Sequence, residues 1–224
     1  MKRTIIALAA ASLAWTALAV EKAELDQKAR KLVAKFEKMQ QKPDKRIPAE
    51  TLRKAEGIIL LDRTKAGFIF AYQGGAGAAM VKDKKSGKWS PIAFMKADEA
   101  SLGFQVGGQQ SFLVILLMNS EGTQLLTDPT IEIGGEARGT AGDKSAGVEE
   151  TASSAPRPVL VYDDRKGLFG GAALKGGALA PDEEGNWAYY GNPLTIKQIL
   201  FEKKAQPTEV AVALATKIAL YSKK

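Results

Sequence analysis

The stretch that decides the fold is GFIFAYQGGAGAAMV, residues 67–81. Aromatic and aliphatic side chains alternate along it as in a β-strand, and its glycines stand at Gly67, Gly74, Gly75 and Gly77. Glycine inside a strand marks a sharp bend or the close approach of another backbone. The stretch therefore predicts a strongly curved, barrel-like sheet. A second interpretation is that the glycines make room for an acyl chain.

Further strands and helices are expected on both sides of this stretch. Strands are predicted at residues 58–61, 89–95, 102–108, 112–118, 159–162, 167–179 and 187–190. Helices are predicted at residues 21–42, 49–55, 120–127, 195–201 and 208–221. Residues 136–158 are rich in small and charged residues, which predicts a long mobile loop. The fold class is thus α+β, an antiparallel sheet with amphipathic helices at both ends.

The predicted helix over residues 21–42 carries two separate rows of side chains. Its apolar row is Leu25, Ala29, Leu32, Val33, Phe36 and Met39. Its cationic row, on an adjacent face, is Lys28, Lys31, Lys35, Lys38 and Lys42. We predict that these lysines and Phe36 contact lipid. The alternative is a helix packed on the domain, because the apolar row cannot serve core and membrane at once.

Residues 1–19 have the three-part pattern of a cleavable secretory signal. Two basic residues are followed by an apolar run that ends in the small residues Ala17 and Ala19. The run is shorter than the roughly 20 residues that a spanning helix needs. We expect an exported, periplasmic or secreted protein with peripheral membrane association, whose residues 20–224 form a single domain.

The amino-acid composition limits the kinds of catalytic and metal site that the chain can contain. The chain has no His and no Cys, so it lacks the commonest general base, the usual zinc ligands and disulfides. The formal charge of +7 falls to about +5 without Lys2 and Arg3, which suits anionic surfaces but is too small to indicate nucleic acid. The acidic pair at residues 163–164 and the cluster at 182–184 are interpreted as solvated turns, with weak calcium binding as the alternative. No cofactor or metal site is predicted.

Two parts of the chain are similar to each other. Residues 65–68 precede a Gly-rich strand, a turn and Trp89, and residues 165–168 precede the same order ending in Trp187. A duplicated hairpin explains this similarity, and the frequent use of glycine in turns is the alternative.

These motifs together resemble the SYLF family, a group of lipid-binding domains. The motifs are AEGII at 55–59, KAGF at 65–68, GAG at 75–77, WSP at 89–91, GFQVGG at 103–108, KGLFGG at 166–171 and YYG at 189–191. The resemblance extends from about Ile47 to Tyr221. It implies a phospholipid-binding module, with phosphoinositide binding through an N-terminal amphipathic helix in some eukaryotic members and actin binding in others.

We therefore expect a non-catalytic module that binds anionic phospholipids at the surface of a bacterial cell envelope. The alternative is a structural or stress-related envelope protein that acts through protein contacts. A carboxylate-dependent hydrolase is the third interpretation. The sequence identifies no protein partner.

The export signal makes a direct prediction. Mature protein from the native host should begin at Val20, because the residues before it fit the small-residue cleavage rule. N-terminal sequencing of the purified protein checks this. Recovery of chains that still carry residues 1–19 would contradict export as a processed protein.

Overall fold

The computed structural model describes residues 2–66, 70–102, 109–133, 158–164, 167–168 and 177–223. The helices are α1 (Lys2–Gln40), α2 (Ala49–Lys54), α3 (Ser120–Gln124), the 3-10 turn η1 (Leu125–Thr127), α4 (Glu183–Tyr190), α5 (Ile196–Leu200) and α6 (Glu209–Tyr221). The strands are β1 (Gly57–Ala66), β2 (Phe70–Val81), β3 (Ala93–Leu102), β4 (Gln109–Leu117), β5 (Ile131–Ile133), β6 (Val159–Asp163), β7 (Gly167–Leu168) and β8 (Gly177–Pro181).

The described strands form one antiparallel sheet in the order β5-β8-β3-β2-β1-β4-β6-β7. Its outer strands, β5 and β7, do not pair with each other in the part of the chain that the structure describes. The predicted α+β class, with helices at both ends of the chain, is confirmed. The predicted barrel-like closure is not.

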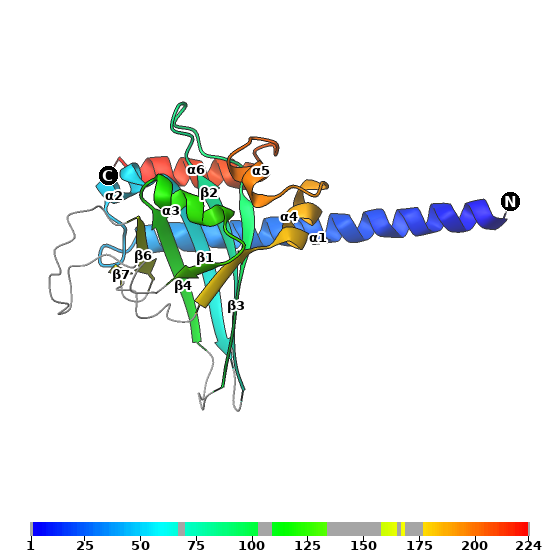
Figure 1. The fold of residues 1–224 in the computed structure, drawn as a ribbon, viewed down its shortest axis with the longest axis horizontal. Coiled ribbons are helices and arrows are strands. Elements are labelled where there is room, and N and C mark those ends of the chain that lie inside the picture. The colour runs from blue at the N-terminus through cyan, green and yellow to red at the C-terminus, as the bar shows by residue number, and fades with distance from the viewer. Residues whose placement is uncertain are drawn as a thin grey trace.

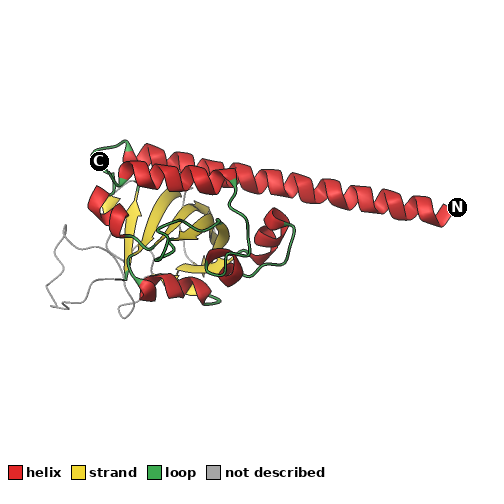
Figure 2. Cartoon of the chain, turned by 90° about the horizontal axis from the view of Figure 1, so that it is seen from above, coloured by secondary structure: helices red, strands yellow, loops and turns green. Residues whose placement is uncertain are grey.

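The sheet is buried on both faces. Along β1, Ile58 and Leu60 join a core with α1, whereas Ile59 and Leu61 join a second core with α5. Successive residues of a strand point to opposite faces, so a strand covered on both sides must be apolar at every position. This requirement explains the unbroken apolar run over residues 112–117 in β4. Figure 2 shows the resulting layers, with two long helices on one side of the sheet and short helices on the other.

Helices α1 and α6 cover one face side by side. Arg30 pairs with Glu209 and Glu37 pairs with Lys217, so both helices advance in the same direction and are parallel. The C-terminal half of α1 lies along the sheet, whereas its N-terminal half extends past the rest of the molecule (Figure 1). Residues 21–24 are exposed, and among the described side chains of α1 the core begins at Leu25.

One glycine of the deciding stretch has a clear backbone role. A methyl group added at Gly75 would lie 2.8 Å from the carbonyl oxygen of Asp62 and 3.2 Å from a methyl carbon of Leu61. The backbone oxygen cannot move away without disturbing the β1–β2 pairing. At this position the architectural interpretation of the glycines is supported, because the two strands need the space.

The predicted strand at residues 187–190 is wrong, because these residues form the second half of α4. Asp182 begins the helix by accepting a hydrogen bond from the Gly185 amide at 3.1 Å, and Gly191 ends it at a φ of 69°. The acidic cluster at 182–184 is therefore a helix cap and first turn and not a loop, and Glu183 and Glu184 are exposed to solvent as predicted. Trp89, in contrast, bridges to Lys82, so the two tryptophans of the suspected duplication lie in different structures.

Other predictions have mixed outcomes. Of the strand predicted at 167–179, residues 167–168 form β7 and residues 177–179 lie in β8, whereas residues 169–176 lie outside the described residues. The mobile loop predicted at 136–158 lies outside the described residues except for Pro158, as do positions 103–108 of the strand predicted at 102–108. The helix predicted at 195–201 is confirmed as α5, which begins with a capping box between Thr195 and Gln198. Asp163 is buried, so its interpretation as a solvated turn residue is wrong.

Asn186 links α4 to the sheet. Its side chain is buried, with Oδ1 accepting from the Phe94 amide at 2.7 Å and Nδ2 donating to the Phe94 carbonyl oxygen at 3.1 Å. The amide thus bonds to β3 as a neighbouring strand would, at the point where β8 ends.

We expect Asn186→Ala to lower the free energy of unfolding by about 2–3 kcal/mol, because the Phe94 amide then stays buried without a partner. Asn192→Ala is the matched control, since Asn192 is exposed and its side chain makes one bond of 3.3 Å. Urea unfolding of both variants checks the difference. Equal losses would show that the Asn186 bonds contribute nothing specific.

Candidate functional site: a lysine face on α1

Four lysines form an exposed row that we call the lysine face: Lys28, Lys31, Lys38 and Lys42. The first three lie on α1 within an arc of about 80°, and Lys42 follows in the turn after the helix. None of the four side chains makes a hydrogen bond or ion pair with a described residue. The structure thus places these four predicted residues together on one exposed side of the helix, and their contact with lipid stays a prediction.

The two other predicted site residues are placed differently. Lys35 is half-buried and its ammonium lies 2.5 Å from a carboxylate oxygen of Asp62 on β1, so its charge is neutralised within the domain. Phe36 is fully buried, and its ring meets that of Tyr221 edge to face at 6.2 Å. In this conformation Phe36 has no access to lipid. The apolar row of α1 belongs to the core, as the alternative interpretation had it.

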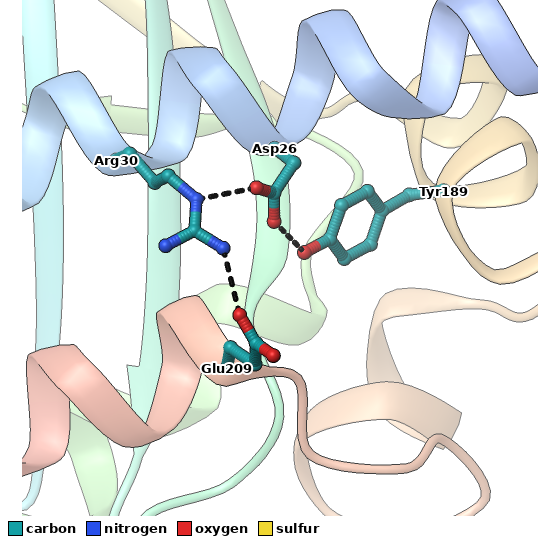
Figure 3. Close-up of polar contacts among 4 residues, drawn as sticks. All are labelled: Asp26, Arg30, Tyr189 and Glu209. Atoms are coloured by element: carbon teal, nitrogen blue, oxygen red, sulfur yellow. Dashed lines mark hydrogen bonds and ion pairs between the residues drawn. The ribbon is translucent and has the colours of Figure 1, made fainter.

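The flank of α1 that faces α6 carries Asp26 and Arg30 (Figure 3). Arg30 bonds Asp26 at 2.6 Å and Glu209 of α6 at 3.1 Å, and the Tyr189 hydroxyl donates to Asp26 at 3.1 Å. The bond to Asp26 is the main cause that raises the pKa of Arg30. This network fixes the rotation of α1 about its axis.

Glu37 and Lys217 of α6 form a second ion pair on the same flank, about two helical turns beyond Arg30. This pair also fixes the rotation of α1 about its axis. Asp26 and Glu37 are thereby compensated within the domain. Glu24, which is exposed, is the acidic residue that remains close to the lysine face. Fewer unpaired acidic residues therefore lie close to the lysine face than the sequence alone indicates.

Exposed apolar side chains lie on α6, the helix beside α1. Val212 and Leu220 are 56% and 44% exposed. Val210, Leu214 and Ile218 of this helix are buried in the core, and the helical spacing leaves Val212 and Leu220 outward. Within the described ranges, no helix is sufficiently long and apolar to cross a bilayer.

Comparison with known proteins identifies the family. A family model described as "Ysc84: Las17-binding protein actin regulator" matches residues 98–221. The chain belongs to this family, which is the SYLF family that the motifs indicated. No solved structure matches the chain.

Two similar curated proteins come from yeast and human. LAS seventeen-binding protein 3 of Saccharomyces cerevisiae is 31% identical over 189 residues, which cover 82% of this chain and 41% of that protein. The human SH3 domain-containing YSC84-like protein 1 is 29% identical over 186 residues, covering 81% of this chain and 54% of the human one. The matched region thus spans about half the length, or less, of these relatives.

The placement of Phe36 generates a stability prediction. Phe36→Ala should lower the free energy of unfolding by about 3–5 kcal/mol, because it removes a fully buried ring from between α1, α6 and the sheet. Phe201→Ala is the control, since that ring is 37% exposed and should cost clearly less. Chemical unfolding followed by circular dichroism measures both. A negligible effect of Phe36→Ala would mean that α1 is not packed on the domain in solution.

Proposed function

We propose that this chain is a non-catalytic module that binds the surface of a membrane containing anionic phospholipids, and that the lysine face is its contact. One observation carries the proposal. The acidic residues Asp26 and Glu37 are paired inside the α1–α6 layer, whereas the four lysines of the face have no partner among the described residues.

The magnitudes favour a reversible, salt-sensitive association. Each basic side chain near an anionic surface contributes about 1 kcal/mol, so the lysine face contributes about 4 kcal/mol before the opposing charge of Glu24 is considered. That energy corresponds to roughly a thousandfold in affinity. Exposed charges are screened over about 10 Å at 0.1 M salt, so binding should weaken as salt rises.

The apolar part of the contact comes from α6 in this proposal. The apolar row of α1 is engaged in the core, which excludes it from the interface unless the helix detaches. Val212 and Leu220 are exposed on the neighbouring parallel helix and are available for shallow insertion between head groups. This division of roles lets the domain bind lipid without unfolding any of its core.

The compartment and the absence of catalysis are part of the same proposal. The signal pattern of residues 1–19 supports export, which makes envelope lipids such as phosphatidylglycerol or cardiolipin the anionic targets. The absence of His and Cys removes most nucleophile and general-base arrangements, and the names of the relatives and of the family describe binding and regulation. A surface contact needs neither a metal nor a cofactor.

Liposome flotation of the full chain tests the proposal. Replacing Lys28, Lys31 and Lys38 by Gln should weaken binding to vesicles with phosphatidylglycerol by about 2–3 kcal/mol at low salt, because three of the four facing charges are removed. Thermal stability should barely change, since Gln has nearly the helix propensity of Lys and these side chains have no described partners.

The matched control removes the same charge elsewhere. Lys85, Lys96 and Lys197 are exposed, lie off α1 and have no partner among the described residues, so their replacement by Gln should leave flotation nearly unchanged. If both triple variants lose affinity equally, the net charge and not the lysine face is responsible. If the first variant binds as tightly as the parent, the proposal is wrong and a protein-contact role becomes the better explanation.

A further inference from the structure

A cavity of about 570 Å³ lies apart from the lysine face, none of whose residues lines it. Its walls come from residues 81–91, which connect β2 to β3, from α3, and from residues 200–207 at the end of α5. The connection between β2 and β3 rises at the top of Figure 1. The volume is within the range of sites that hold small molecules, roughly 300–1,000 Å³.

The inner wall of the cavity is apolar. Val81 and Leu200 are buried beneath it, and the rings of Trp89 and Phe201 lie along it. Phe201 is 37% exposed, which is unusual for a large apolar side chain of this domain. An apolar ligand group of moderate size would therefore find a surface of aromatic and aliphatic carbon here.

The rim of the cavity is basic. Four lysines line it, Lys82, Lys84, Lys88 and Lys203, against the two carboxylates of Glu56 and Asp83. Both carboxylates are already engaged, since Lys84 lies 3.1 Å from Glu56 and Lys203 lies 2.9 Å from Asp83. Lys82 and Lys88 are left with no acidic partner at bonding distance among the described residues.

Lys82 is held in place at this rim. Its ammonium donates to the Arg53 carbonyl oxygen at 2.9 Å and lies 5.3 Å from the centre of the Trp89 ring. Burial lowers the pKa of Lys82, with a smaller opposing effect of Glu56. A partly desolvated ammonium beside an aromatic ring gains more from an incoming anion than a fully solvated one.

Lys203 has a strained backbone at the mouth of the cavity. Its φ is 56°, the one positive value at a non-glycine residue in the described part of the chain. Strain of this kind is concentrated at functional sites. The Lys203 side chain is held by its ion pair with Asp83. Asp83 in turn accepts hydrogen bonds from the amide and the hydroxyl of Ser86 at 2.7 and 2.8 Å. Lys203 and Ser86 together hold the pKa of Asp83 well below its usual range, so the ion pair between Lys203 and Asp83 persists at neutral pH.

We propose that this cavity binds one amphiphilic anion, a phosphate monoester with an apolar chain, with the phosphate between Lys82 and Lys88 and the chain against Trp89 and Phe201. The site is separate from the lysine face and does not depend on it. It gives the domain the capacity to hold a single lipid-like molecule.

Tryptophan fluorescence of the full chain tests the proposal. The chain has three tryptophans, so Trp15→Phe with Trp187→Phe leaves Trp89 in the cavity as the reporter. Octyl phosphate, kept below its micelle concentration, should change the Trp89 signal saturably. Inorganic phosphate and octyl glucoside, which each lack one half of the ligand, should bind at least tenfold more weakly.

Three substitutions test which lysines contribute to phosphate binding. Lys88→Gln should weaken octyl phosphate binding at least fivefold with an unchanged melting temperature, because this side chain has no described partner. Lys85→Gln is the matched control, since Lys85 is exposed in the same turn but does not line the cavity. Lys203→Gly should relieve the strained φ and keep or raise stability, yet weaken binding by leaving Asp83 unpaired.

Several results would overturn the proposal: no saturable response to octyl phosphate, an equal response to octyl glucoside or to inorganic phosphate, or equal losses from Lys85→Gln and Lys88→Gln. The test is independent of membrane docking. Lys88→Gln should leave vesicle flotation unchanged, and the triple Gln variant of the lysine face should leave octyl phosphate binding unchanged. Failure of one site is therefore distinguishable from failure of the other.

Discussion

A sheet with two apolar faces is the constraint on which the rest of this structure depends. Each central strand presents large apolar side chains on both sides, as Ile58 and Ile59 do on β1. Such a sheet is stable in water only if helices cover both faces, because the exposed area would otherwise cost about 25 cal/mol per Å². The apolar row of α1 is needed for that cover, so its burial is a requirement of the fold.

The orientation of the lysine face follows from this cover. Once the apolar row packs on the sheet, the ion pairs of Lys35 with Asp62 on one flank and of Glu37 with Lys217 on the other fix the helix between β1 and α6. Exposed pairs of this kind add little stability on their own. Their importance is that they neutralise the charged residues on the two flanks of α1. The lysines of the lysine face then have no partner among the described residues.

Properties that depend on local spacing were predictable from the sequence, and those that depend on distant contacts were not. The helical period of α1 and the short helix after Thr195 were correctly predicted. Residues 187–190 were misassigned because aromatic side chains favour strands, although Asp182 and Gly191 carried the helix signals. Periodicity also predicted the row of lysines but could not separate Lys35, whose partner Asp62 is 27 positions away. The cavity was missed for the same reason, because Lys82 and Lys203 line one cavity only in the folded chain.

The continuity of α1 through residue 20 has a consequence for the processed protein. In the proposed export, cleavage after Ala19 would create a new helix start at Val20, with a positive α-amino group beside the positive end of the helix macrodipole. Glu21 and Glu24 then lie in or next to the first turn, where carboxylates interact favourably with that dipole. In the intact chain the same residues lie in the middle of a helix. In a chain processed as proposed, Glu21 and Glu24 would thus stabilise the new N-terminus of a helix that is continuous in the intact chain.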